Sequence, residues 1–168
     1  GSEYFVGHFD GEQFQAEQAA RWVDYGRDFY APVSWDNIPA DDGRRIWIGW
    51  MNNWETSLVP TSPWRGAMTV PRSLALKRVA FNTEEPAVIT LIQQPVEELR
   101  LLELWSRTLE PASGWPPAAL TRPGELDDMT FVLEVEIEPA DARSAGVRIR
   151  TGDDEYTEIG FDRFDAAV

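Results

Sequence analysis

Cysteine is absent from the 168-residue sequence, and histidine occurs once, at position 8. Without thiols there is no disulfide, no thiolate nucleophile and no cysteine-ligated metal site. Basic residues are also scarce, since 15 Lys and Arg stand against 29 Asp and Glu, for a formal charge of −14. A nucleic-acid surface needs clustered Lys and Arg, and a membrane helix needs roughly 20 apolar residues in a row. We therefore expect neither a nucleic-acid nor a membrane partner.

Signatures of bound cofactors and metals are missing as well. The sequence contains no G-x-G-x-x-G and no phosphate-binding loop. His8, alone between Gly7 and Phe9, cannot build a metal site, and it is predicted to lie on a strand surface. The acidic stretch TGDDEY (151–156) lacks the ligand spacing of a calcium loop and is predicted to be a hairpin turn. No cofactor and no metal are expected.

What the sequence does contain is β-strand patterning and tryptophan. Apolar residues make up 43% of it, and eight tryptophans, twelve glycines and twelve prolines are spread along it. Alternating segments at 3–9, 28–36, 46–54, 67–78 and 87–94 are separated by turn signals, with a hairpin turn at 10–14. Pro32 indicates an edge strand or a bulge. This spacing predicts an all-β sandwich, barrel or propeller.

The pattern changes at Pro95. Apolar residues spaced three apart, with a proline at the start and glutamates in the first turn, predict a short helix over 95–103. A Pro- and Gly-rich connection follows, and then a half-solvated antiparallel sheet is predicted from residues 129–139, 145–151 and 155–162. Within 129–139 one face carries Phe131, Leu133, Val135 and Ile137. We place a domain boundary within 94–104.

Candidate site residues lie in the aromatic strand RRIWIGWMNNW (44–54) and in the segment before it. Alternation puts Trp50 on the face opposite Trp47, so both rings cannot line one cavity. The tryptophans either fill a β-core or hold a polar ring-shaped ligand. Asp28 and Asp36 allow a second interpretation, a carboxylate pair for glycoside chemistry. Against it, aspartates such as Asp24 and Asp36 are typical of turns.

Six stretches together resemble the fructan-cleaving glycoside hydrolases of family 32, the invertases, levanases and inulinases. They are YFVGHFDG, WVDYGRDFYAPVSW, RRIWIGWMNNW, PTSPWRGAMTVPRSLAL, QQPVEELR and YTEIGFDR. The resemblance covers almost the whole chain and implies the end of a five-bladed β-propeller, then a short helix and part of a β-sandwich. Residues 1–94 would be the last part of the propeller including its final blade, 95–104 the linker helix, and 105–168 the N-terminal part of the sandwich.

The same resemblance implies that Trp50 contacts fructose as a flat platform, with Asp28 or Tyr30 supplying a supporting hydrogen bond. The acidic motifs on which the family's catalysis rests, Trp-Met-Asn-Asp-Pro-Asn-Gly, Arg-Asp-Pro and a Glu beside Cys, do not occur here. In WMNNW, Asn53 stands in place of the nucleophilic Asp, and an amide cannot attack an anomeric carbon. We assign no catalytic residue and expect this chain alone to be inactive. Arg65 could be a cation that binds ligand, but we favour a role in holding loop carbonyls or an acid across blades.

Two function classes remain open. The chain is either part of a retaining β-fructofuranosidase acting on sucrose, levan or inulin, or a stand-alone carbohydrate-binding β-module without catalysis. In both, a fructose-containing oligo- or polysaccharide is the expected partner. A strand starts at residue 3 with no partner before it, and 159–168 resemble a hairpin without its return strand. We therefore expect a piece of a larger protein that self-associates or binds the missing upstream half, and the cellular compartment stays open.

Overall fold

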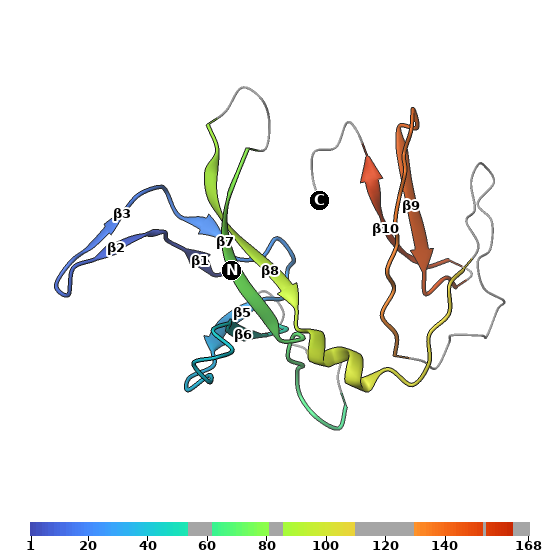
Figure 1. The fold of residues 1–168 in the computed structure, drawn as a ribbon. Coiled ribbons are helices and arrows are strands. Elements are labelled where there is room, and N and C mark those ends of the chain that lie inside the picture. Colours follow the sequence, from blue (N-terminus) through green and yellow to red (C-terminus); the bar gives the residue numbers. More distant parts are fainter. Residues whose placement is uncertain (54–61, 81–85, 110–129, 153, 163–168) are drawn as a thin grey trace. The chain divides into compact units, whose positions relative to one another are not determined.

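The computed structural model describes residues 1–53, 62–80, 86–109, 130–152 and 154–162. The chain divides into two compact units, Gly1–Leu104 and Trp105–Val168. Both are built from antiparallel strands, and a short 3₁₀ helix, η1 (Glu97–Leu102), follows the last strand of the first unit (Figure 1). The all-β prediction and the helix predicted over 95–103 are confirmed.

The first unit starts with four short strands. They are β1 (Glu3–Tyr4), β2 (Gly7–Phe9), β3 (Phe14–Ala16) and β4 (Arg21–Trp22). The predicted hairpin is present as β2–β3, and the Asp10 carboxylate accepts bonds from the backbone N–H groups of Glu12 and Gln13 in its turn. The strand at residue 3, expected to have no partner before it, has one later in the sequence. The chain returns after the hairpin, so β4 pairs with β1.

A four-stranded antiparallel sheet forms the larger part of this unit. Its strands run in sequence order as β5 (Tyr30–Ser34), β6 (Arg45–Trp50), β7 (Arg72–Val79) and β8 (Val88–Pro95). The register of β5 against β6 shifts between Tyr30 and Val33, and β5 lies at the edge of the sheet. Proline has no N–H to donate to a ladder, which is why Pro32 fits an edge strand with a bulge, as predicted.

Two side chains from the first part of the chain, Tyr4 of β1 and Gln18 between β3 and β4, occupy the outer edge of β8. The Gln18 amide donates to the Ile89 carbonyl at 2.8 Å and accepts from the Ile89 N–H at 3.0 Å. The Leu91 N–H donates to the Tyr4 hydroxyl at 3.1 Å. Unpaired strand edges recruit other chains. These three bonds use backbone groups of β8 that would otherwise be open to a foreign strand.

The segment between β4 and β5 is held on the sheet by a polar network around Arg72, which we call the Arg72 network. Arg72 Nη1 donates to Asp24 at 2.5 Å and to Gln93 at 3.1 Å, and its guanidinium lies 4.6 Å from the centre of the Phe29 ring. Phe29 is only 3% exposed. The Gln93 amide also accepts from the Trp47 indole N–H at 3.1 Å. The network therefore connects strands β6, β7 and β8 to the segment before β5.

Helix η1 is tied to the β5–β6 loop by Arg44. Its guanidinium donates two bonds to Asp42 and two to Glu98, which lies 54 residues later in the chain. These hydrogen bonds from Arg44 lower the pKa values of the Asp42 and Glu98 carboxyl groups below their usual range. Glu98 and Asp42 thus stay charged on an exposed surface, and the start of η1 is held to the β5–β6 loop.

The second unit contains a regular hairpin. Strand β9 (Ser144–Ile149) pairs antiparallel with β10 (Thr157–Asp162), and the Gly152 N–H donates to the Glu155 carbonyl at 2.7 Å in the turn. This confirms the predicted turn, of which residue 153 lies outside the described residues. Arg148 bonds Glu158 across the strands at 2.8 Å.

The strand predicted within residues 129–139 is wrong for the residues that the structure describes. Residues 130–138 form no strand there, and Val132, Leu133 and Val135 are 91%, 40% and 42% exposed. A strand needs a hydrogen-bonding neighbour as well as an alternating sequence. Of the connection predicted before it, residues 106–128, all but the first four lie outside the described residues.

Candidate functional site

The two tryptophans of β6 lie in different surroundings. The Trp47 ring packs 5.7 Å from Phe29, centre to centre, and its N–H bonds Gln93. Gly49 faces the same phenylalanine ring, as strand alternation requires. The half-buried Trp47 therefore packs against the buried Phe29, and strand alternation places Trp50 on the opposite face of β6.

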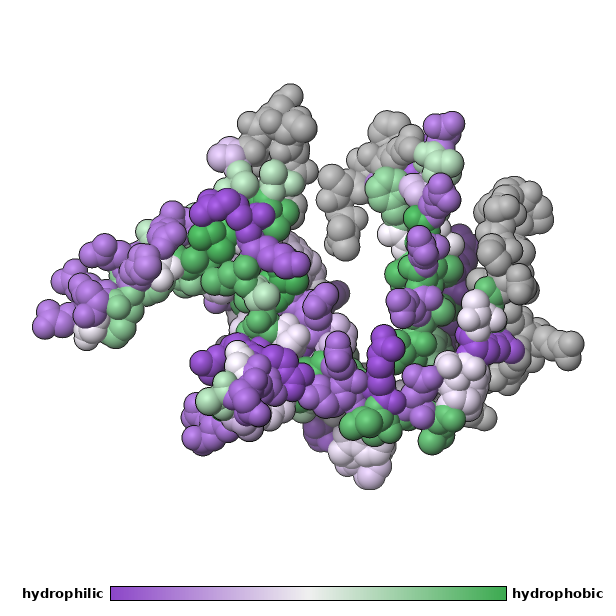
Figure 2. Space-filling view, viewed as in Figure 1, coloured by the Kyte–Doolittle hydropathy of each residue, from purple (hydrophilic) through white to green (hydrophobic). Residues whose placement is uncertain are grey.

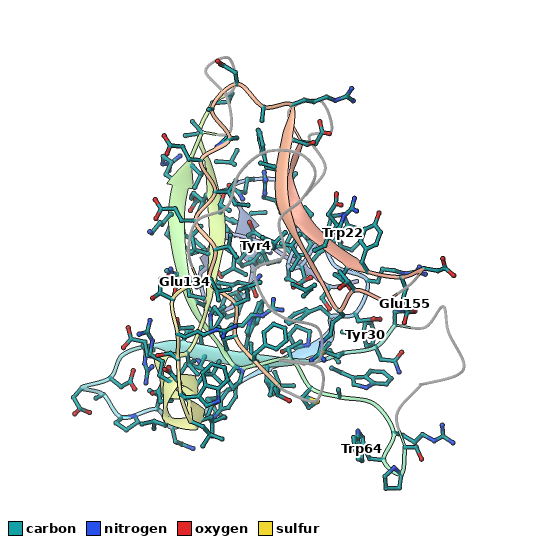
Figure 3. The ribbon with its side chains drawn as sticks, turned by 90° about the vertical axis from the view of Figure 1, so that its right-hand side faces the viewer. Tyr4, Trp22, Tyr30, Trp64, Glu134 and Glu155 are labelled. Carbon is teal, nitrogen blue, oxygen red and sulfur yellow. The ribbon has the colours of Figure 1, made fainter. Side chains whose placement is uncertain are left out.

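Trp50 is the last residue of β6 and lies opposite Tyr30 across the ladder. The two ring centres are 6.4 Å apart with an interplanar angle of 66°, an edge-to-face arrangement that aromatic pairs favour. The bulge directly after Tyr30 separates this pair from the regular part of β5. Figure 3 shows Tyr30, the first residue of β5, and Trp64 on a separate segment of the chain.

The chain turns sharply after Trp50, and the turn places the side-chain amide of Asn53 in contact with Asp28. The Asn52 N–H donates to the Trp50 carbonyl at 2.9 Å, and the buried Asn52 side chain accepts from the Asn53 N–H at 2.7 Å. Asn53 Nδ2 then donates to the Asp28 carboxylate at 2.5 Å. Asp28, Tyr30 and Trp50, the three predicted binding residues, thus lie in one local group with Asn53, which we call the Trp50 cluster.

Residues 66–69 lie against the end of β6 and against Trp50. Met51 donates its N–H to the Ala67 carbonyl, and Thr69 donates its N–H to the Gly49 carbonyl, each at 2.9 Å. Trp50 and Met68 form an antiparallel bridge between these bonds. The segment 67–69 therefore runs beside the end of β6, and Gly66 lies directly against the Trp50 indole.

The structure does not bring Asp28 and Asp36 together. They lie at opposite ends of β5, and a five-residue strand spans roughly 16 Å, more than the separation of a glycosidase carboxylate pair. Asp36 is an exposed turn residue. Asp24 accepts the N–H of Gly26 in a turn, as predicted, but it also binds Arg72, which the sequence interpretation missed.

The remaining candidates behave as surface residues. His8 is exposed on β2 and lies 3.2 Å from Glu17, as its predicted surface role requires. Arg65 is exposed as well. No group of three or more potential metal ligands occurs among the residues described. In that same part of the chain, no helix is long and apolar enough to cross a membrane.

The sequence alone did not predict two of the contacts in and around the Trp50 cluster, those of Asn53 and Gly66. The sequence indicates for Asn53 only that it cannot be a nucleophile, yet its amide binds the predicted site residue Asp28. Gly66 carried a weak signal, because a glycine beside a strand end permits close backbone approach. Neither contact follows from local spacing, since 25 residues separate Asn53 from Asp28.

Comparison with known proteins agrees with the resemblance. Residues 1–95 match the Glycosyl hydrolases family 32 N-terminal domain. A levanase of Bacillus subtilis (strain 168) is 42% identical over 173 residues, which cover 100% of this chain and 25% of that protein. The extracellular exo-inulinase inuE of Aspergillus niger (strain ATCC MYA-4892 / CBS 513.88 / FGSC A1513) is 40% identical over 121 residues, 64% of this chain and 21% of that protein.

Solved structures give the same result. The β-fructofuranosidase from Schwanniomyces occidentalis, complexed with fructosyl-erythritol, is 38% identical with a TM-score of 0.51. The match covers 56% of this chain and 18% of that structure. The chain spans a quarter or less of the length of these three relatives. On the match over residues 1–95 and these identities, the chain belongs to glycoside hydrolase family 32.

Proposed function

We propose that this chain is part of a retaining glycoside hydrolase that cleaves β-fructofuranosidic bonds in sucrose, levan or inulin. Its own contribution is to line the fructose pocket, with the acid/base machinery supplied from elsewhere. The names of the relatives, levanase and exo-inulinase, support this substrate class, as does the fructosyl-erythritol in the solved neighbour. The observation that carries the proposal is the Trp50 cluster, where a half-buried indole is grouped with a carboxylate and a phenol.

Each residue of the cluster has a distinct role in this proposal. The Trp50 indole offers a flat apolar face to the C–H groups of a sugar and keeps a polar N–H at one edge. Asp28 accepts hydrogen bonds from sugar hydroxyls, because an ionised carboxylate has several acceptor positions beyond the one that Asn53 uses. Tyr30 packs edge-on against the indole and offers a hydroxyl.

The proposal also gives the elements a place in a larger fold. A four-stranded antiparallel sheet is the usual unit of a propeller blade, so β5–β8 would be the final blade of a five-bladed propeller ending near residue 94. Residues 95–104, with η1, would link the two domains. Residues 105–168 would start a β-sandwich to which β9 and β10 contribute.

We expect the isolated chain to bind fructose weakly and to release no fructose from sucrose or inulin. A retaining glycosidase needs a nucleophile and a proton donor about 5 Å apart, and none of the family's acidic motifs is present in the sequence. Binding is measured by NMR titration with fructose, and hydrolysis by fructose release. Trp50→Ala should weaken binding about tenfold, because it removes the stacking face.

The control is Trp35→Ala, which removes a partly exposed tryptophan outside the cluster and should leave the affinity unchanged. Equal effects of the two variants, or hydrolysis that persists after repurification and disappears on mutation of this chain, would contradict the proposal. A reading frame with the three acidic motifs upstream would support the hydrolase. A frame of 168 codons would favour a stand-alone binding module.

We further propose that the isolated chain self-associates through apolar surface. Phe9 and Phe14 are a cross-strand pair on the β2–β3 hairpin and are 65% and 50% exposed. Figure 2 shows further hydrophobic surface where β1 and β7 lie. Apolar patches of this kind are typical of protein interfaces. The partner is a second copy or the upstream part of the same enzyme.

Light scattering after size exclusion should therefore show a dimer or a larger species that depends on concentration. The double variant Phe9→Ser/Phe14→Ser should shift the mass toward the monomer. Leu101→Ser/Leu104→Ser is the matched control, because these leucines are 85% and 93% exposed but lie on and after η1. A compact wild-type monomer at all concentrations would refute self-association.

A further inference from the structure

We propose that Gly66 is a positioning residue for Trp50, an inference that rests on the proposed role of Trp50 in fructoside binding. Gly66 is buried, and its φ of +81° lies in the left-handed region that favours glycine. A Cβ atom at this position would lie 2.9 Å from Trp50 Nε1. That is well inside a normal contact between nonbonded carbon and nitrogen atoms. The Trp50 indole therefore occupies the space that a side chain at position 66 would need.

Whether residue 66 approaches the edge or the face of the Trp50 indole decides if the face stays open to a sugar. The ring atoms on either side of Nε1, Cδ1 and Cε2, would lie 3.8 and 3.9 Å from the same Cβ. Both are about equally distant and much farther than the nitrogen, so residue 66 approaches the nitrogen edge of the indole and not its face. Gly66 thus allows a close edge contact while it leaves the flat surface of the ring uncovered. A stacking platform requires this combination.

Neither neighbour of the ring is free to move aside. The backbone of residues 67–69 is fixed to β6 by the bonds from Met51 and Thr69, and the Thr69 hydroxyl also accepts the Gly49 N–H at 3.0 Å. On β5, Tyr30 holds its edge-on contact with Trp50 through the strand register. A methyl group at position 66 would therefore displace the indole, because the ring is the part that can rotate.

Two other glycines separate this steric effect from backbone strain. Gly43 and Gly11 also have positive φ, +64° and +104°, but a Cβ at either position would have no atom within 4 Å. Alanine at Gly43 carries the same kind of conformational penalty as alanine at Gly66, without contact to any ring. Gly43→Ala is the matched control, and Gly11→Ala repeats it at a second site.

The test uses the full 168-residue chain with ¹⁵N-labelled tryptophan. The indole N–H signal of Trp50 is assigned as the one that disappears in Trp50→Phe. Gly66→Ala should shift this signal and weaken fructose binding by about two- to tenfold. Gly43→Ala should leave both the signal and the affinity as in the wild type. An unchanged Trp50 signal in Gly66→Ala would overturn the proposal.

A second measurement covers the case in which Gly66→Ala destabilises the chain. Phenylalanine lacks the nitrogen edge, so in a Trp50→Phe background the stability cost of Gly66→Ala should fall to that of Gly43→Ala. An equal cost in both backgrounds would refute the contact. If the wild-type chain binds no fructose but the Trp50 signal still shifts in Gly66→Ala, Gly66 positions the ring and the proposed binding function is wrong.

Discussion

Replacement of Arg72 by alanine is expected to lower the free energy of unfolding of the first unit by about 2–3 kcal/mol. Arg72 binds Asp24 and Gln93 and lies over the Phe29 ring, so the variant loses a charge pair, a hydrogen bond and a cation–π contact together. The side chains of Arg72 and Asp24 are only 22% and 21% exposed. The Asp24 carboxylate would therefore be left poorly hydrated and without its cation. Urea unfolding followed by tryptophan fluorescence measures the loss.

Arg78→Ala is the matched control, because Arg78 lies on the same strand and, within the residues that the structure describes, its side chain makes one long bond, of 3.5 Å, to the Ala87 carbonyl. Its cost should stay within about 0.5 kcal/mol. In a double-mutant cycle, Asp24→Ala combined with Arg72→Ala should cost less than the sum of the single variants. Equal losses from Arg72→Ala and Arg78→Ala would show that the Arg72 network contributes nothing to stability.

Gly49→Ala is expected to cost about 2–3 kcal/mol, although alanine is ordinarily preferred to glycine inside a strand. A Cβ at Gly49 would lie 2.6, 2.8 and 2.9 Å from three atoms of the Phe29 ring. That ring is buried and contacts both Trp47 and the Arg72 guanidinium, so it has little room to move. The same urea titration gives the loss.

The substitution Phe29→Leu tests whether a clash with the Phe29 ring causes the loss of stability in Gly49→Ala. A smaller side chain at position 29 should accept the added methyl group, so Gly49→Ala should cost less in the Phe29→Leu background than in the wild type. If the cost of Gly49→Ala is the same in both backgrounds, the clash with the Phe29 ring is not its origin.

Local patterns in the sequence predicted the parts of the fold that are decided locally. A strand alternates with a fixed period of two, which is why the opposite placement of Trp47 and Trp50 followed from their spacing alone. The turn at Asp10 was likewise predictable, since its carboxylate bonds the N–H groups of the next few residues. Alternation in residues 130–138 predicted a strand that the structure lacks, because pairing depends on a partner and not on the pattern.

In the candidate site, too, local sequence patterns do not predict the contacts between distant residues. Family resemblance selected Asp28, Tyr30 and Trp50, and the structure brings them into one group. The contacts that orient them are non-local. Asp24 meets Arg72 across 48 residues, and the fit of Gly66 to an indole edge depends on a bridge between two segments. Such contacts are set by tertiary packing, so no window of neighbouring residues contains them.

The bond pair between Gln18 and Ile89 has a consequence for which substitutions the chain can accept. The Gln18 amide donates and accepts at once, as a residue of an adjacent strand would. Glutamate lacks the donor, leucine lacks both groups, and asparagine is one methylene shorter. Position 18 lies outside every strand and is not buried, so it resembles a loop position open to exchange. Its chemistry is nevertheless restricted to a carboxamide at the end of a two-carbon side chain.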